Sequence, residues 1–424
     1  MNGGTRKRGS AWSYYFDLGK VDGKRKKKEK GGFRTKKEAE QALAAALNEY
    51  NNAGMVFEPS EITVSDYLDQ WYELSCKLNL KYNTQVGYLR IIETHIKPKF
   101  GLYKLKAINP TILQEYANSL KLNGYSKSHI VGILTVFQSA LDYAIEPLHY
   151  ISQNPMKAVK FPKIERKPRE RIILTVDEWQ QILDRFQDTR YYIPLMIGFY
   201  TGLRISETFA LTWDDIDLDN KTLTVNKQIV KRNFGADVRK VVEQKGKREQ
   251  RSSWYFTTPK TQSSIRTIPF GDTLYNALKT EHTAQKKNEL KYGEFYTIHV
   301  LKKEVDEKGN DMFQVVPVQK CVESQLQRTK LVCVAENGQY TSTDSFKYCS
   351  RIIHREMQLA FDFHSLRHTH ATLLIESGAN VKNVQARLGH SNITTTLQTY
   401  VHDTEKMGEQ SVELFEQITA VKTS

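Results

Sequence analysis

From residue 364 to residue 372 the chain reads HSLRHTHAT, and the pattern around this segment predicts a helix from about 365 to 377. His364 and Arg367 stand three positions apart, a spacing that makes two side chains neighbours on one helix face. An imidazole and a guanidinium on one face can act on the same ligand. His370 shares a face with three leucines, so we interpret it as a hydrogen-bonded histidine of the core.

Three further short segments carry polar residues of a similar kind. They are TGLRISE at 201–207, PKT at 259–261, and LGHS at 388–391 followed by a tyrosine. Each is weak by itself, because a single arginine, or one tyrosine among 22, is usually a surface or core residue. Together with the first segment they supply two arginines, a lysine, two histidines and a tyrosine. These residues are Arg204, Lys260, His364, Arg367, His390 and Tyr400.

Such a set is suited to the cleavage of a phosphodiester by side chains alone. Two guanidinium groups can hold the non-bridging oxygens of a phosphate and stabilise the extra charge of the transition state. A tyrosine hydroxyl can attack phosphorus and form a covalent phosphotyrosine. An imidazole with a pKa of ~6.5 can accept the tyrosine proton at neutral pH, and a lysine can protonate the leaving oxygen. We therefore expect no metal and no other cofactor.

The segments TGLRISE, HSLRHTHAT, LGH and TTLQTYVH resemble the motifs of the tyrosine recombinases, the phage-integrase family, which includes integrases of phages and integrative or conjugative elements. The resemblance covers nearly the whole chain, since residues 1–55 resemble an arm-binding domain and residues 63–160 a helical core-binding domain. It implies an enzyme that cleaves and rejoins DNA during the integration and excision of a mobile element. It also implies a homotetramer on double-stranded DNA with core and arm attachment sites, accessory DNA-bending or excision factors, and no need for ATP.

Carried over position by position, the resemblance implies a nucleophile at Tyr400 and phosphate-binding arginines at Arg204 and Arg367. The other implied roles are a general acid at Lys260, a general base at His364, a hydrogen-bond donor to the phosphate at His390, and an acidic support for the first arginine at Glu207.

The positive charge of the chain is concentrated at the N-terminus. The 424 residues carry a formal charge of +14, of which residues 1–37 contribute +10. A strongly basic chain favours a nucleic-acid partner. The sequence predicts strands at 12–18, 25–28 and 32–34, a hairpin turn at Asp22-Gly23, and a helix that begins with a Thr35/Glu38 capping box. A β-ribbon built from these strands fits a DNA major groove. The alternative interpretation of this segment is a disordered basic tail. The expected DNA-binding residues are Lys24, Arg25, Lys26, Lys27, Lys28 and Arg34.

The fold class expected is α+β and multidomain. We expect an arm-type DNA-binding domain at 1–56, an all-α core-binding domain with its linker at 57–165, and a mixed α/β catalytic domain with a C-terminal tail at 166–424. The basic linker at 160–171 either follows a phosphate backbone or is a solvated tether. Helix starts are predicted at Ser65, Thr84, Asn109, Ser126 and Thr175, and strands at 222–230, 254–258 and 264–269, the last two joined by a short turn that contains Lys260.

Two insertions and an apolar tail are not explained by the motifs. The segments 231–253 and 296–320 exceed a minimal catalytic domain of the family, and the second is predicted to form a β-hairpin. They are either surface loops or additional DNA contacts. Apolar residues from Val412 to Ile418 recur at helical spacing, and this stripe docks either on a neighbouring subunit or, as the alternative, on its own domain.

Other functions are compatible with parts of the pattern. A type IB topoisomerase uses similar chemistry, but a relaxing enzyme needs no N-terminal DNA-binding ribbon. A non-catalytic DNA-binding protein at recombination sites is disfavoured by the complete catalytic set, and an RNA-binding protein by the lack of RNP or KH motifs. His364 and His368 have zinc-compatible spacing, but the segment lacks the glutamate of a HExxH site and places an arginine between them.

The expected location is the cytoplasm of a bacterial host. No apolar stretch in the sequence approaches the ~18 residues that span a membrane, and the N-terminus has no apolar signal core. The four cysteines show no metal-ligating spacing, so we expect reduced structural thiols.

Overall fold

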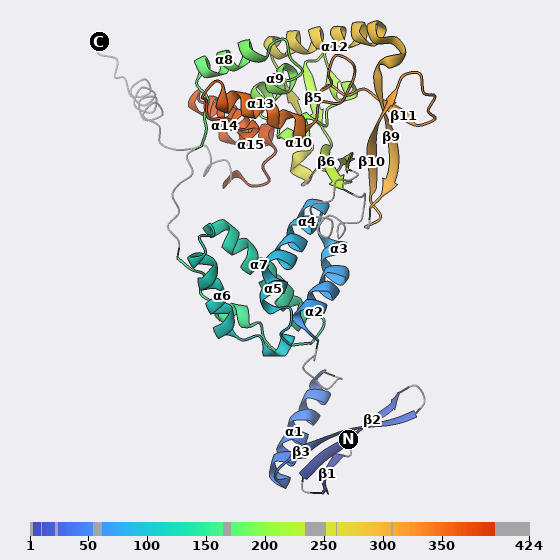
Figure 1. Ribbon diagram of the computed structural model, residues 1–424, viewed down its shortest axis with the longest axis vertical. Coiled ribbons are helices and arrows are strands. Elements are labelled where there is room, and N and C mark those ends of the chain that lie inside the picture. The colour runs from blue at the N-terminus through green and yellow to red at the C-terminus, as the bar shows by residue number, and fades with distance from the viewer. Residues whose placement is uncertain are drawn as a thin grey trace, which may run out of the picture. The chain divides into compact units, whose positions relative to one another are not determined.

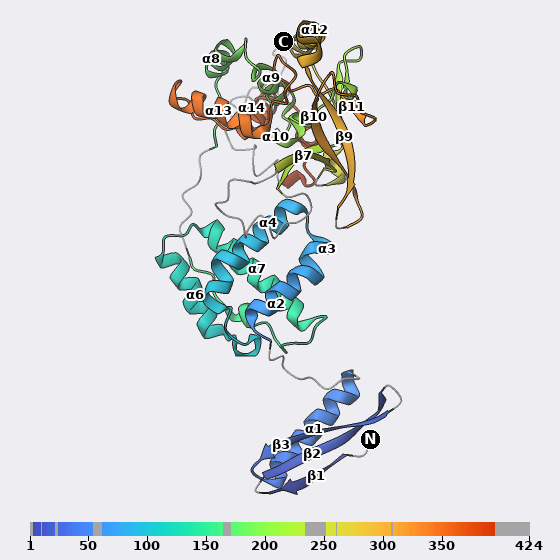
Figure 2. The same cartoon turned by 45° about the vertical axis from the view of Figure 1, so that its right-hand side comes forward.

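The computed structural model describes residues 3–9, 11–21, 24–53, 62–163, 171–233, 252–259, 261–306 and 308–394. The chain divides into two compact units, Met1–Arg166 and Lys167–Ser424, whose elements are labelled in Figures 1 and 2.

The N-terminal part of the first unit is a three-stranded antiparallel sheet packed against one helix. Tyr14 and Phe16, two residues apart on the middle strand, are buried against the helix together with Ala46, because alternate residues of a strand share one face. The first strand was not predicted, and the segments expected as two strands at 25–28 and 32–34 form one. The elements are β1 (Gly3–Arg8), β2 (Ala11–Val21), β3 (Lys24–Phe33) and α1 (Lys36–Ala53).

Polar contacts fix this small sheet and the start of its helix. Glu29 on β3 accepts hydrogen bonds from Arg6 Nε on β1 at 3.0 Å and from Ser13 Oγ on β2 at 3.1 Å, so one carboxylate joins all three strands. The predicted capping box is confirmed, since the backbone N–H of Glu38 donates to Thr35 Oγ1 at 3.2 Å. The predicted Asp22-Gly23 turn lies outside the described residues.

Residues 62–163, the described remainder of the first unit, form helices and the loops between them. The predicted caps at Asn109 and Ser126 are confirmed, as each side chain accepts a hydrogen bond from a backbone N–H of the first turn. The starts predicted at Ser65 and Thr84 are wrong, because Thr63 caps the first helix and the second begins after Lys81. The α-helices are α2 (Val64–Trp71), α3 (Lys77–Asn79), α4 (Tyr82–Ile91), α5 (Lys97–Phe100), α6 (Pro110–Leu122) and α7 (Lys127–Ile145), with π-helical turns at Tyr72–Cys76 and Ile92–Ile96.

Helix α7 is the central helix of this bundle. Among the described residues it alone is long and apolar enough to cross a membrane by length and composition. Eight of its residues are buried in the unit, and Phe137 packs against Phe100 with ring centroids 5.4 Å apart. Its apolar character therefore matches a core helix of the bundle.

The second unit combines a group of helices with two antiparallel sheets. In Figures 1 and 2 the helices α8, α9, α13 and α14 lie together, away from the long strands β9 and β10. Among the described residues the α-helices are α8 (Val176–Phe186), α9 (Tyr192–Thr201), α10 (Ile205–Thr208), α12 (Asp272–Tyr292), α13 (Thr343–Arg355), α14 (Phe363–Glu376) and α15 (Val381–Leu388). The strands are β4 (Ile216–Asp217), β5 (Thr222–Val225), β6 (Gln228–Asn233), β7 (Ser252–Thr257), β8 (Arg266–Pro269), β9 (Thr297–Val305), β10 (Asp311–Gln319) and β11 (Gln327–Thr329).

The two sheets share one long ribbon of the chain. One sheet has the order β4-β5-β8 and the other β11-β9-β10-β7-β6. Val225 pairs with Arg266 in the first sheet, and Gln228 pairs with Thr257 in the second. Between these two pairs one segment contributes only residues 226–227, whereas the opposite segment contributes the longer stretch 258–265. The strands predicted at 254–258 and 264–269 are present as β7 and β8, but they lie in different sheets and do not pair with each other.

The hairpin predicted at 296–320 is confirmed and is part of the core of the unit. Its second strand pairs with β7, with Val315 opposite Trp254, and Val300 and Val315 are buried. Two lysines near its tip are paired with acidic side chains, Lys302 with Glu304 and Lys303 with Asp311. This segment is therefore not a surface loop. Of the other insertion, residues 234–251 lie outside the described part of the chain.

The four cysteines are free thiols. Cys76, Cys333 and Cys349 are buried, and burial raises the pKa of the Cys76 thiol to about 12. These three therefore have the burial expected of structural thiols, while Cys321 is exposed.

Candidate functional site

Arg367 of α14 is a completely buried guanidinium. Its Nη1 donates to the carbonyl oxygen of Gly202 at 2.7 Å, and its Nη2 donates to the carbonyl oxygen of Leu388 at 2.8 Å. A buried charge is tolerated only when it is hydrogen-bonded. Because both of these acceptors are neutral carbonyls, the two bonds orient the guanidinium without cancelling its charge.

Arg204 directly precedes the short helix α10 and is half-buried, with 35% of its side chain exposed. Its Nη1 donates to Glu207 Oε1 at 2.7 Å, and its backbone N–H donates to Glu207 Oε2 at 3.1 Å. Glu207 is 3% exposed. Burial alone would raise the pKa of Glu207, but Arg266 and Arg204 lower it below the ordinary value, so this carboxylate stays ionised and supports the first arginine.

The turn after α15 joins the two arginines. Gly389 ends the helix with a φ of +68°, a left-handed conformation that favours glycine. The carbonyl of Leu388 accepts from Arg367, and the carbonyl of Gly389 lies 3.5 Å from Arg204 Nη2. His390 follows directly, so this turn brings an imidazole to both guanidinium groups.

The histidines of the site are kept neutral by their surroundings. Burial lowers the pKa of His390 to about 4, assisted by the charges of Arg367 and Arg204. Burial also lowers the pKa of His364, with Arg367 as the next largest cause. His364 stands one helix turn before Arg367 on α14, and His390 follows Gly389, whose carbonyl lies 3.5 Å from Arg204 Nη2, so the chain places both imidazoles beside the arginines. A neutral imidazole can accept a proton, as a general base must.

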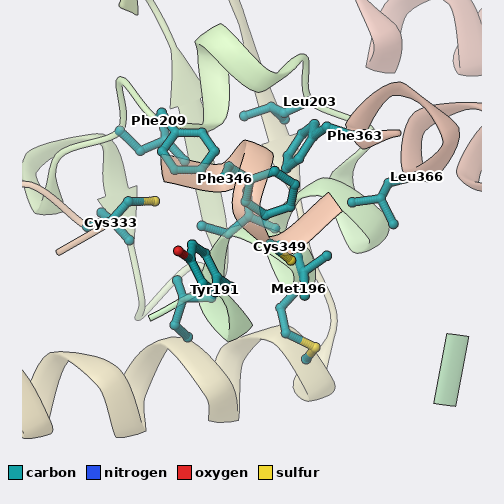
Figure 3. Close-up of a cluster of buried hydrophobic side chains, with 14 of the residues drawn as sticks. Tyr191, Met196, Leu203, Phe209, Cys333, Phe346, Cys349, Phe363 and Leu366 are labelled. Carbon is teal, nitrogen blue, oxygen red and sulfur yellow. The ribbon is translucent and has the colours of Figure 1, made fainter. Parts of the chain in front are cut away.

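The polar residues are held in place by the apolar residues directly before them. Leu203, Phe363 and Leu366 are buried in the core cluster drawn in Figure 3. Each of them precedes a site residue in the chain, namely Arg204, His364 and Arg367. Core packing therefore fixes the backbone from which the three polar side chains extend.

His368 and His370 lie on the same helix but have other surroundings. The ring of His368 meets that of His364 edge-on at a centroid distance of 4.6 Å. His370 Nε2 accepts a hydrogen bond from Arg387 Nε at 3.0 Å, which confirms the interpretation of His370 as a bonded core histidine. Over the described ranges no group of three or more His, Cys, Asp or Glu side chains is placed to hold a metal ion.

Two arginines that surround the site, Arg266 and Arg387, were not among the residues predicted from the sequence. Arg266 Nη2 donates to Glu207 Oε2 at 3.0 Å, and Arg387 donates to the carbonyls of Pro269 and Tyr200 at 2.9 and 3.0 Å. A signal was present for the first: Arg266 stands two residues from the buried Ile268 on one strand, so it occupies a core-facing position where an arginine is unusual.

The structure brings together four of the predicted catalytic residues and their support. These are Arg204, Glu207, His364, Arg367 and His390. Lys260 and Tyr400 lie outside the described residues, as does the C-terminal tail. Of the expected DNA-binding residues, 24–28 lie on β3, and Arg34 follows that strand, where its backbone N–H donates to Glu38 at 3.0 Å.

Chemically, the described site presents two guanidinium groups and two neutral imidazoles around one turn. Guanidinium groups bind phosphate oxygens in a directed way, and the complete burial of Arg367 strengthens such contacts. The arrangement is therefore suited to holding one phosphate group next to a proton acceptor.

Comparison with known proteins gives three family matches along the chain. The phage integrase family matches residues 173–407, the N-terminal SAM-like domain of phage integrases matches 63–121, and an arm DNA-binding domain matches 5–50. A relative described as a XerC-like tyrosine recombinase from Caldanaerobacter subterraneus subsp. tengcongensis is 28% identical over 388 residues, which cover 90% of this chain and 89% of the relative.

Two solved structures share the fold. The Tn1549 transposon integrase in complex with a circular intermediate DNA is 23% identical with a TM-score of 0.58, covering 84% of this chain and 99% of that one. The lambda integrase tetramer bound to a Holliday junction is 18% identical with a TM-score of 0.53, covering 88% of this chain and 89% of that one. The predicted fold class is confirmed by these matches.

Proposed function

The chain belongs to the phage integrase family and is a tyrosine-type site-specific DNA recombinase of a mobile element, and we propose that the residues around the 388–390 turn are its active centre. In this proposal Arg204 and Arg367 bind the scissile phosphate, and His390 donates a hydrogen bond to it. Glu207 supports Arg204, and His364 is the general base. The remaining roles belong to Lys260 as general acid and Tyr400 as nucleophile.

The observation that carries the proposal is the turn itself. Leu388 and Gly389 offer their carbonyls to Arg367 and Arg204, and His390 follows. Two cations from distant segments are thereby directed at one place, which is what a phosphate with a developing additional charge requires.

The proposed reaction conserves the number of phosphodiester bonds. The Tyr400 oxygen attacks phosphorus while His364 takes its proton, and the bond to the 5′ oxygen breaks as Lys260 supplies a proton to it. The products are a 3′-phosphotyrosine and a free 5′ hydroxyl. The 5′ hydroxyl of a partner duplex then attacks the phosphotyrosine and releases Tyr400, so neither ATP nor a metal enters the balance.

The partner is double-stranded DNA, contacted in two places. We propose division of the chain at residues 56 and 165, with the helical and catalytic domains on the core site and the basic sheet on arm sites. The lambda integrase structure is a tetramer on a Holliday junction, and this supports a homotetramer on two duplexes. The expected bacterial cytoplasmic location and the accessory bending or excision factors are retained as parts of this proposal.

One experiment separates this function from that of a type IB topoisomerase. The protein is incubated with two differently sized plasmids that carry the ends of its own element, without ATP and with EDTA. We expect recombinant products that join the two plasmids. Relaxation of supercoils without any joined product would instead favour the topoisomerase, and binding without cleavage would favour a non-catalytic DNA-binding protein.

A further inference from the structure

We propose that Arg266, at the start of β8, is a positioning residue that keeps Arg204 available for the scissile phosphate. This inference rests on the proposed function of Arg204 in the same site. Arg266 does not need to touch DNA in this role, because it acts through Glu207.

Three hydrogen bonds define the surroundings of Arg266. Its Nη2 donates to Glu207 Oε2 at 3.0 Å, its Nε donates to the carbonyl of Arg387 at 2.6 Å, and its Nη1 donates to the carbonyl of Ser264 at 2.9 Å. The side chain is 7% exposed. One guanidinium therefore joins the carboxylate of the site, the helix that leads to His390, and the segment that follows Lys260.

The charges explain why a second arginine is useful at this point. Glu207 carries one negative charge, and by itself it would cancel the positive charge of Arg204. With Arg266 on the other carboxylate oxygen, the three groups together carry one net positive charge. Because Arg204 is the more exposed of the two arginines, this remaining charge faces the position of a phosphate.

The packing around Arg266 leaves little freedom for another arrangement. A Cβ atom added to Gly389 would lie 3.0 Å from Arg266 Nη1 and 3.1 Å from the carbonyl oxygen of Ser263. The 388–390 turn therefore packs directly against Arg266. A shorter side chain in place of Arg266 would leave both the 388–390 turn and the Glu207 carboxylate without their contacts to the guanidinium.

The test compares cleavage of two nicked duplexes that carry the core site of the element. One has the normal scissile phosphodiester, and the other has a methylphosphonate, in which a methyl group replaces one non-bridging oxygen and removes the negative charge. Loss of an arginine that acts by attracting the charge of the phosphate slows cleavage of the neutral substrate less than cleavage of the charged one. A residue needed only for folding affects both substrates equally.

We expect Arg266→Met to slow cleavage of the phosphodiester by about 10–100-fold, less than the 10²–10³ expected for loss of a direct donor. The defect on the methylphosphonate should be at least tenfold smaller, as for Arg204→Ala. Arg266→Lys keeps the charge but not all three bonds, so it should recover most of the loss. Arg266→Gln, which removes the charge but keeps a hydrogen-bond donor, replaces Arg266→Met if that variant fails to fold. Arg232 on β6 is another buried arginine, with an exposed fraction of 7%. Arg232→Met is therefore the control for the effect of removing a buried arginine.

Equal defects of Arg266→Met on both substrates, or of Arg266→Gln if only that variant folds, would overturn the inference, and so would an unchanged rate of the same variant on the phosphodiester. If Arg204→Ala itself cleaves at the wild-type rate, the proposed function of the site has failed. If Arg204→Ala is defective while Arg266→Met or Arg266→Gln, which both lack the charge, cleaves at the wild-type rate, only this inference has failed.

Discussion

The carbonyl oxygen of Gly202 accepts a 2.7 Å hydrogen bond from Arg367 Nη1. Gly202 stands two residues before Arg204, so the segment that presents one arginine also orients the other. The two arginines are more than 160 residues apart in the chain, and this bond makes their positions interdependent.

Replacement of Gly202 by alanine should damage both arginines at once. Gly202 has a φ of +67°, and an added Cβ would lie 2.8 Å from Leu388 Cδ2 and 2.9 Å from His370 Cδ2. We expect Gly202→Ala to lower the free energy of unfolding by about 1–3 kcal/mol and to reduce cleavage further than this loss explains. Urea denaturation and cleavage rates measure the two effects.

The control for backbone strain alone is Gly309→Ala. Gly309 has a φ of +79° with no atom within 4 Å of an added Cβ. If both variants lose stability equally and cleave equally well, the contact of Gly202 with the site does not contribute to the cleavage rate.

Arg204→Ala and Arg367→Ala should each slow cleavage by about 10²–10³, as for loss of one preorganised donor. Their stabilities should differ, because Arg204 is half-buried whereas Arg367 is completely buried. Loss of Arg367 leaves the carbonyls of Gly202 and Leu388 without this donor, which costs about 1–3 kcal/mol. Thermal denaturation beside single-turnover cleavage tests both statements, and a cleavage rate within twofold of wild type would refute the role of that arginine.

The stability of the second unit should fall in mild acid, partly because of His299 on β9. This imidazole is 3% exposed, and burial lowers its pKa to about 4. The unfolded chain binds the proton with an ordinary pKa of ~6.5, so the contribution of His299 to stability is complete above that pH and is lost as the pH falls toward 4. His299→Phe should flatten the decline of Tm between pH 6.5 and 4.

The matching control is His354→Phe on α13, where the side chain is exposed. We expect this variant to keep the pH profile of the wild type. If both variants have the wild-type profile, the buried imidazole does not control acid stability.

Deletion of residues 1–55 should change the salt dependence of DNA binding. Residues 1–37 hold +10 of the +14 net charge, and each neutralised phosphate contributes a slope of about 0.9 in log K against log salt. We expect the slope on arm-site DNA to flatten by several units, while cleavage of a short core duplex survives. Binding isotherms at several salt concentrations measure this, and an unchanged slope would mean that the basic sheet does not contact DNA.

Much of the site was predictable from the sequence, because its residues fall in short motifs with local geometry. The spacing of His364 and Arg367 and the Thr175 capping box depend on one helix turn each, and the structure has both. The first strand, Gly3–Arg8, was missed since its residues GGTRKR show no apolar alternation. The role of Arg266 was missed because it depends on Glu207 and Arg387, which lie 59 and 121 residues away.

The most direct test of the account is the identity of the residue that becomes linked to DNA. The wild-type protein is incubated with a nicked duplex carrying its own core site, and the covalent adduct is isolated on a denaturing gel, digested and mapped by mass spectrometry. We predict a 3′-phosphate on Tyr400, and we predict that Tyr400→Phe binds the duplex normally but forms no adduct. A phosphate on another residue, or adduct formation by Tyr400→Phe at the wild-type level, would contradict the account.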